Sequence, residues 1–67
     1  MSSLVRRLSS YLTENWNNIP GFVRWSIEQV AGTALVEAVV RGFNATVSYL
    51  STVSSSVLEK IASLLGI

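Results

Sequence analysis

The sequence predicts an all-α protein made of an amphipathic helix, a Pro-Gly corner, a long hydrophobic helix and a short C-terminal helix. Three observations lead to this prediction. Apolar residues recur three and four positions apart along most of the chain, no segment alternates apolar and polar residues as a strand would, and the one proline, Pro20, stands among turn-forming residues. With 67 residues, the chain is predicted to form a single helical domain over 1–67.

The first helix is predicted over about 3–17. Its apolar side chains fall at helical spacing, and they are Leu4, Val5, Leu8, Tyr11, Leu12 and Trp16. Ser2 or Ser3 stands at the start of this pattern and is suited to cap the helix, because a serine side chain accepts a hydrogen bond from the free N–H groups at a helix start.

A corner at 17–21 and a long helix over about 22–53 follow. Pro20 disfavours helix at the residue before it and fits the start of a new helix, with Gly21 after it. Beyond the corner, apolar residues form one row at steps of four and three: Val36, Val40, Phe43, Val47 and Leu50. At 1.5 Å per residue this helix would be about 45 Å long. A helix stop at Gly42, giving a hairpin, is the alternative, but the row keeps the same face there, which favours one continuous helix.

A short last helix is predicted over about 56–65. The tetrapeptide Ser56-Val57-Leu58-Glu59 has the capping-box pattern, in which the serine side chain and the glutamate each accept a hydrogen bond from a free N–H group. Gly66 is then suited to end the helix.

The stretch 33–50 is nearly all apolar or hydroxyl-bearing, but it contains Glu37 and Arg41. A charge near the centre of a bilayer costs roughly 2.5–3.5 kcal/mol, while each Leu, Val or Phe returns only about 0.3–0.6 kcal/mol. A membrane span is therefore disfavoured. Because Glu37 and Arg41 stand four residues apart, they are predicted to form an ion pair, within the helix or with a neighbouring copy.

The composition favours association. Hydrophobic residues make up 49% of the chain and charged residues 13%, whereas ordinary soluble domains carry about 25% charged residues. The chain has no cysteine for a disulfide, and a chain this short is not expected to bury so much apolar surface alone. The fold is therefore predicted to be completed by packing with other subunits. The expected partners are copies of the chain, with lipid as a further candidate.

The residues expected to make subunit contacts lie in the long helix. Small residues recur there every four positions, the spacing at which helix backbones approach closely, and they are Ala34, Ala38, Gly42 and Thr46. The apolar row Val36, Val40, Phe43, Val47 and Leu50 is expected to pack beside them. The simpler explanation of the alanines is their high helix propensity. A glycine inside a helix costs roughly 1 kcal/mol, however, which favours a packing role for Gly42.

The composition speaks against catalysis, cofactor binding and metal binding. The chain has no His, Cys or Asp, and its four glutamates are scattered, whereas acid-base and metal chemistry need convergent groups. With a net charge of +1 and no basic cluster beyond Arg6-Arg7, sequence-specific binding of nucleic acid is not expected. The sequence thus predicts a protein that is not an enzyme.

The chain resembles small hydrophobic helical filament subunits. The features it shares with them are its length, the helix-corner-helix at 17–21, the long Val/Ala/Gly/Ser/Thr-rich helix 22–53 and the scarcity of charge. Two families have this pattern: coat proteins of rod-shaped or bacilliform archaeal viruses, and conjugative-type pilins. The resemblance covers the whole chain but is architectural, and the chain departs from pilins in lacking a clear pair of apolar spans. It implies a structural subunit that assembles into a helical filament or capsid, in a virion or an extracellular filament.

Two other functions stay open from the sequence. A small accessory subunit of a membrane complex would have the same composition. A membrane-active peptide, such as a bacteriocin, a toxin or a viral lytic segment, would also carry an amphipathic helix before a corner. Such peptides usually have a strongly positive face, however, and this chain is almost neutral. Either alternative would make the chain membrane-associated.

Overall fold

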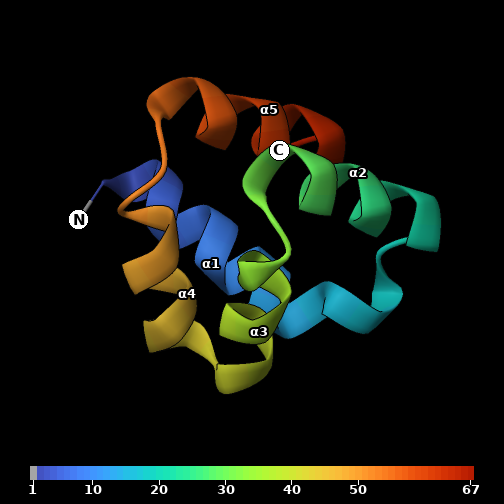
Figure 1. The fold of residues 1–67 in the computed structure, drawn as a ribbon, viewed down its shortest axis with the longest axis horizontal. Helices are drawn as coiled ribbons and strands as arrows, with labels where there is room; N and C mark the ends of the chain where they lie inside the picture. Colours follow the sequence, from blue (N-terminus) through green and yellow to red (C-terminus); the bar gives the residue numbers. More distant parts are fainter. Residues whose placement is uncertain (1) are drawn as a thin grey trace.

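The computed structural model describes residues 2–67, and in that range the prediction of an all-α protein is confirmed (Figure 1). Its α-helices are α1 (Ser3–Asn15), α2 (Gly21–Ala31), α3 (Ala34–Arg41), α4 (Phe43–Leu50) and α5 (Ser55–Leu65). A single 3₁₀ turn, Trp16–Asn18, leads from α1 into the corner. None of the helices in this range is long and apolar enough to cross a bilayer.

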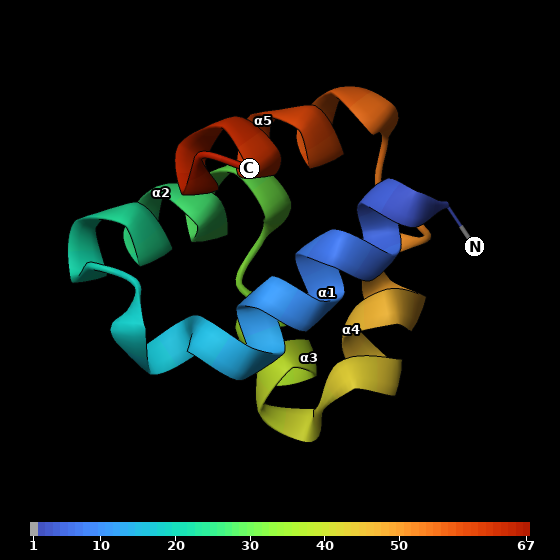
Figure 2. The same ribbon diagram turned by 180° about the vertical axis from the view of Figure 1, so that it is seen from behind.

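Helix α1 lies on one face of the molecule, at the front in Figure 2, and its inner side contacts α3, α4 and α5 (Figures 1 and 2). Helix α2 packs against α5, and α3 and α4 pack against each other as a hairpin. The radius of gyration is 10.3 Å, close to the value of about 11 Å expected for a folded domain of this length. The accessible surface of 4022 Å² is likewise close to the roughly 4,200 Å² expected for a folded monomer of this mass.

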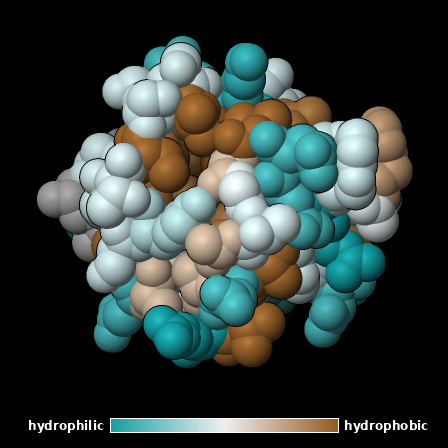
Figure 3. Space-filling view, viewed as in Figure 1, coloured by the Kyte–Doolittle hydropathy of each residue, from teal (hydrophilic) through white to brown (hydrophobic). Residues whose placement is uncertain are grey.

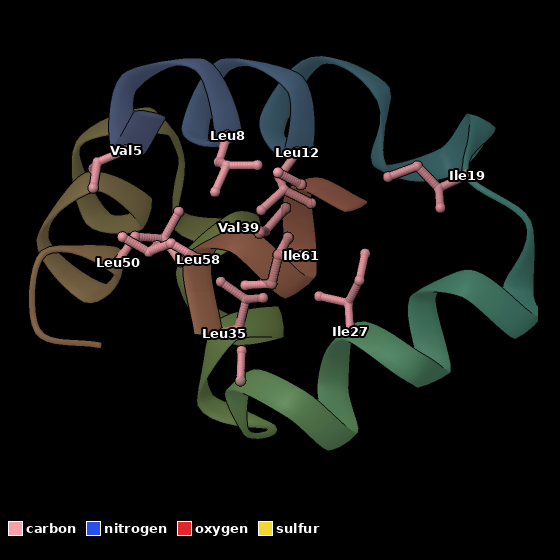
Figure 4. Close-up of a cluster of buried hydrophobic side chains, with 12 residues drawn as sticks. Val5, Leu8, Leu12, Ile19, Ile27, Leu35, Val39, Leu50, Leu58 and Ile61 are labelled. Carbon is pink, nitrogen blue, oxygen red and sulfur yellow. The ribbon is translucent and has the colours of Figure 1, made fainter. Parts of the chain in front are cut away.

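One chain therefore closes its own core. All five helices of the described range contribute to it (Figure 4), and the cluster consists of Val5, Leu8, Leu12, Ile19, Ile27, Ala31, Leu35, Val39, Leu50, Leu58, Ile61 and Ala62. That packing with other subunits covers the apolar groups left outside this core stays a prediction.

The prediction of one long helix over about 22–53 was wrong, because the chain turns sharply at two glycines. Gly32 has φ 95° and ψ 154°, and Gly42 has φ 122° and ψ −172°. These values fall in a region of backbone conformation that is essentially restricted to glycine, since any side chain would be strained there. The chain thus forms α2, α3 and α4 in place of one rod, and the stop at Gly42 that gives a hairpin is the correct alternative.

Contacts at Gly32 fix the first of these turns. The N–H of Gly32 donates to the carbonyl of Glu28 at 2.7 Å and closes the last turn of α2. The hydroxyl of Tyr49, in α4, donates to the carbonyl of Ala31, which satisfies an acceptor at the end of α2. A Cβ atom on Gly32 would lie 3.1 Å from that hydroxyl oxygen, whereas a Cβ on Gly42 would have no atom within 4 Å.

Serines cap the first and last helices. Ser2 Oγ accepts from the N–H of Val5 at 3.1 Å at the start of α1. Helix α5 begins at Ser55 and is capped by Ser54, whose Oγ accepts from the N–H of Val57 at 3.4 Å. The capping box predicted at Ser56 was therefore two residues too late, because three consecutive serines offer the same cap chemistry.

Two of the turns predicted from single residues are present. At the corner the carbonyl of Pro20 accepts from the N–H groups of Val23 at 2.9 Å and Arg24 at 3.0 Å, so that α2 starts at Gly21 directly after the proline. Gly66, with φ 75°, ends α5 in the left-handed conformation.

Two buried hydroxyl groups differ in their hydrogen bonding. Thr46 is fully buried in α4, and its Oγ1 donates to the carbonyl of Gly42 at 2.9 Å. Ser9 is fully buried in α1, and its Oγ has no hydrogen-bond partner among the described residues. An unpartnered buried hydroxyl is destabilising by about 1–3 kcal/mol.

We predict that Gly32→Ala destabilises the fold more than Gly42→Ala. Both variants place a side chain in a glycine-only conformation, which costs of order 1–3 kcal/mol, but only at Gly32 does the new methyl group also crowd the Tyr49 hydroxyl. Urea unfolding followed by circular dichroism measures both losses. A wild-type midpoint for either variant would show that the chain does not turn there.

A second prediction concerns the buried hydroxyls. Ser9→Ala is expected to raise the free energy of unfolding by up to about 1 kcal/mol, because it removes a buried polar group without a partner. Thr46→Val keeps the shape but removes the bond to Gly42, so it is expected to lower that free energy by about 1 kcal/mol. Thermal unfolding compares the two variants directly. An equal decrease in the free energy of unfolding for both would show that Ser9 and Thr46 do not differ in their hydrogen bonding.

Candidate interaction surface

Three adjoining hollows form one continuous surface across α2, α3 and α4, which we call the α2–α4 face. The first hollow, of about 300 Å³, is lined by Trp16, Gly21, Arg24, Trp25, Glu28 and Val36. The second, of about 310 Å³, is lined by Val36, Glu37, Val40 and Arg41. The third, of about 480 Å³, is lined by Ala34, Glu37, Ala38, Arg41, Ala45, Ser48, Tyr49 and Thr52. Val36 is common to the first two hollows, and Glu37 and Arg41 to the last two, so the surface is unbroken.

Large apolar side chains project from this part of the molecule. Val40 is 78% exposed and Trp25 is 61% exposed, and Phe22, one turn before Trp25, is 76% exposed. The reason is helical geometry: α2 turns Ile27 and Ala31 inward, which leaves Phe22 and Trp25 on its opposite side. These apolar groups do not contribute to the core and are available to a partner.

Charges of both signs stand among these apolar groups. Glu37 and Arg41 are exposed on the outer side of α3, one helical turn apart. No ion pair joins these two side chains in the structure of residues 2–67, so the predicted pairing within one helix is not formed there. On α2, the guanidinium of Arg24 lies over the ring of Trp16, 5.9 Å from its centroid, in cation–π geometry.

The surface coloured by hydropathy shows this mixture directly (Figure 3). Near the bottom of the view, where α3 ends, a hydrophobic area lies directly beside strongly hydrophilic side chains. Isolated exposed apolar residues are ordinary on a soluble protein, but a group of them bordered by charges is typical of an interaction site.

The structure separates the residues predicted for subunit packing into two groups. Thr46 and Leu50 are fully buried within this chain, so they cannot touch a second subunit unless the fold opens, and Ala38 is 7% exposed at the lining of the third hollow. Gly42 lies between helices, and no close helix approach occurs at its Cα within the chain. The small-residue row therefore does not form one stripe on one helix.

The second group is accessible. Ala34 and Val40 are exposed, and Val36 is half-buried. All three lie on α3 and line hollows of the α2–α4 face. Phe43 is 37% exposed at the start of α4, while Val47 is half-buried against the core. For the accessible residues, packing with another subunit stays a prediction.

Sequence reasoning missed the contribution of α2 to this surface. The signal was present: between residues 22 and 31 the inward stripe is supplied by Val23, Ile27 and Ala31, so Phe22 and Trp25 fall on the side where polar residues are usual. Aromatic residues on the polar side of an amphipathic helix indicate a surface that is covered by a partner.

Across the described part of the chain, no three side chains of His, Cys, Asp or Glu come together in a way that could hold a metal ion. Searches against protein-family models, curated proteins and solved structures gave no match to this chain.

We predict that neighbouring valines of α3 respond differently to truncation. Val39 is 7% exposed and lies in the core, so Val39→Ala is expected to lower the free energy of unfolding by about 2 kcal/mol. Val40 is 78% exposed, so Val40→Ala is expected to change it by less than about 0.5 kcal/mol. Urea unfolding of dilute protein measures both values. A large loss for Val40→Ala would mean that this side chain belongs to the fold rather than to a free surface.

Proposed function

We propose that this chain is a non-enzymatic structural subunit that associates with copies of itself through the α2–α4 face. The observation that carries the proposal is the exposure of Trp25 and Val40 on one continuous surface of a chain whose core is already closed. Because the core is complete without them, these side chains do not serve the fold. Covering them with a partner removes apolar surface from water, which favours association.

The charges of the face favour a protein partner over a lipid surface. Helices that lie in a membrane interface carry mainly Lys and Arg on their polar side. Here Arg24 and Arg41 are accompanied by Glu28 and Glu37. A surface with both signs is compatible with a second copy of itself, because each charge finds its opposite on the same face. The low net charge of +1 also leaves little repulsion between copies.

The closed core determines how such an assembly is built. Each copy folds first and then contacts its neighbours through its surface. One long helix per chain would instead have required helices of different copies to build the core together. That the assembled copies form a helical filament or capsid, with lipid as a further component, is supported only by the features shared with coat proteins and pilins that remain: the length, the helix-corner-helix at 17–21 and the scarcity of charge. The location that this proposal implies is a virion or an extracellular filament.

Sedimentation velocity in water without detergent tests the proposal. We expect species heavier than the 7.3 kDa chain, with a fraction that rises with concentration. Val40→Asp is expected to shift the chain to monomer, because it places a charge in the middle of the contact while leaving the core intact. Ser55→Asp adds the same charge at an exposed site on α5, outside the α2–α4 face, and is expected to associate like the wild type.

Two results would overturn the proposal. The first is a folded monomer at every concentration. The second is a monomer in water that binds vesicles through Trp25 and Val40, which would favour the membrane-associated alternative instead.

A further inference from the structure

We infer that two copies of this chain pair through α3 in antiparallel orientation, about a twofold axis beside Val40. The inference rests on the proposed self-association and specifies its contact. It assigns Val40 to the centre of the contact and Glu37 and Arg41 to ion pairs with the partner's Arg41 and the partner's Glu37.

The outer line of α3 provides the first part of the argument. Leu35, Ala38 and Val39 turn inward, so the helix presents the opposite side to solvent. Glu37, Val40 and Arg41 all lie on that outer side and are exposed. Helix α3 therefore stands between the hollow toward α2 and the hollow toward α4, and the second hollow lies over its own outer side, beside Val40.

The spacing of the charges provides the second part. Glu37 and Arg41 are four residues apart, which is about 6 Å along the helix axis, and Val40 lies about 1.5 Å from their midpoint. When a second α3 lies antiparallel across this midpoint, Glu37 stands opposite the partner's Arg41, and Arg41 opposite the partner's Glu37. The two copies of Val40 then meet next to the axis. Such a contact is self-complementary, as a twofold interface requires.

The charge order disfavours a parallel pair of α3 helices at the same register. In a parallel pair of α3 helices at the same register, Glu37 would face the partner's Glu37 and Arg41 the partner's Arg41. Like charges placed opposite each other oppose association and suppress that arrangement. The charges thus select one orientation in addition to attracting the partner.

The size of the molecule allows a stable contact of this kind. A specific interface buries about 1,000 Å² or more in total, which is about 500 Å² from each partner. The molecule measures 28 × 24 × 19 Å, so each of its sides presents about that area or more. With α3 at the centre of the contact, the three hollows leave room for the side chains of the partner's helices.

Charge reversal tests the pairing. Glu37→Arg and Arg41→Glu each place like charges opposite each other in both symmetry-related pairs, so each single variant is expected to raise the dissociation constant about tenfold or more. The double variant Glu37→Arg/Arg41→Glu restores opposite charges in the antiparallel dimer and is expected to return to within about threefold of the wild type. An equimolar mixture of the two single variants is expected to associate more tightly than either variant alone. Sedimentation at low ionic strength measures all four samples.

Glu59→Arg on α5 is the matched control, because it makes the same charge change as Glu37→Arg at an exposed site outside the face. It is expected to associate like the wild type. Circular dichroism checks that every variant keeps its helices.

The outcomes distinguish this inference from the proposed function. A double variant that stays as weak as the singles, or single variants that associate like the wild type, would overturn the antiparallel pairing while self-association stands. A wild-type chain that is monomeric throughout would overturn both.

Discussion

The backbone conformation at Gly32 and Gly42 is the constraint on which the rest of the structure depends. At both residues φ and ψ take values that are accessible essentially to glycine alone, and each residue directly follows the last turn of a helix. An apolar stretch that would otherwise extend as one rod of about 45 Å becomes three short helices. Short helices let 67 residues fold back against the inner side of α1, so that one chain builds a closed core.

The turns within residues 22–53 also determine which side chains are exposed to solvent. Helix α3 is held between its neighbours with Leu35 and Val39 turned inward, which leaves Val40 at the surface one residue further on. The hydroxyl of Tyr49 links α4 to the end of α2 and so fixes the relative positions of the elements that border the face. The α2–α4 face thus forms because the chain folds back at Gly32 and Gly42. Its exposed groups, Trp25 among them, are part of the apolar composition that a single chain does not bury.

Local signals in the sequence identified features that act within a few residues: Ser2 caps α1 and Gly66 ends α5. The turn at Gly32 was missed because the apolar periodicity continues past it, and periodicity carries no information on φ. For the same reason, an apolar row does not show whether its partner is the same chain or another. Val40 and Leu50 belong to one row in the sequence, yet Val40 is 78% exposed and Leu50 is fully buried. That distinction arises only when tertiary packing chooses the inward stripe of each short helix.

The most direct test of this account is an isotope-filtered NOE experiment on an equal mixture of ¹³C-labelled and unlabelled chains, which detects contacts between copies only. The account predicts such contacts at the methyl groups of Val40 and at the ring of Trp25. It predicts none at Leu35, Leu50 or Ile61, whose neighbours all belong to the same chain. Contacts between copies at those three core residues would contradict it, because they would mean that helices of different chains build the core together.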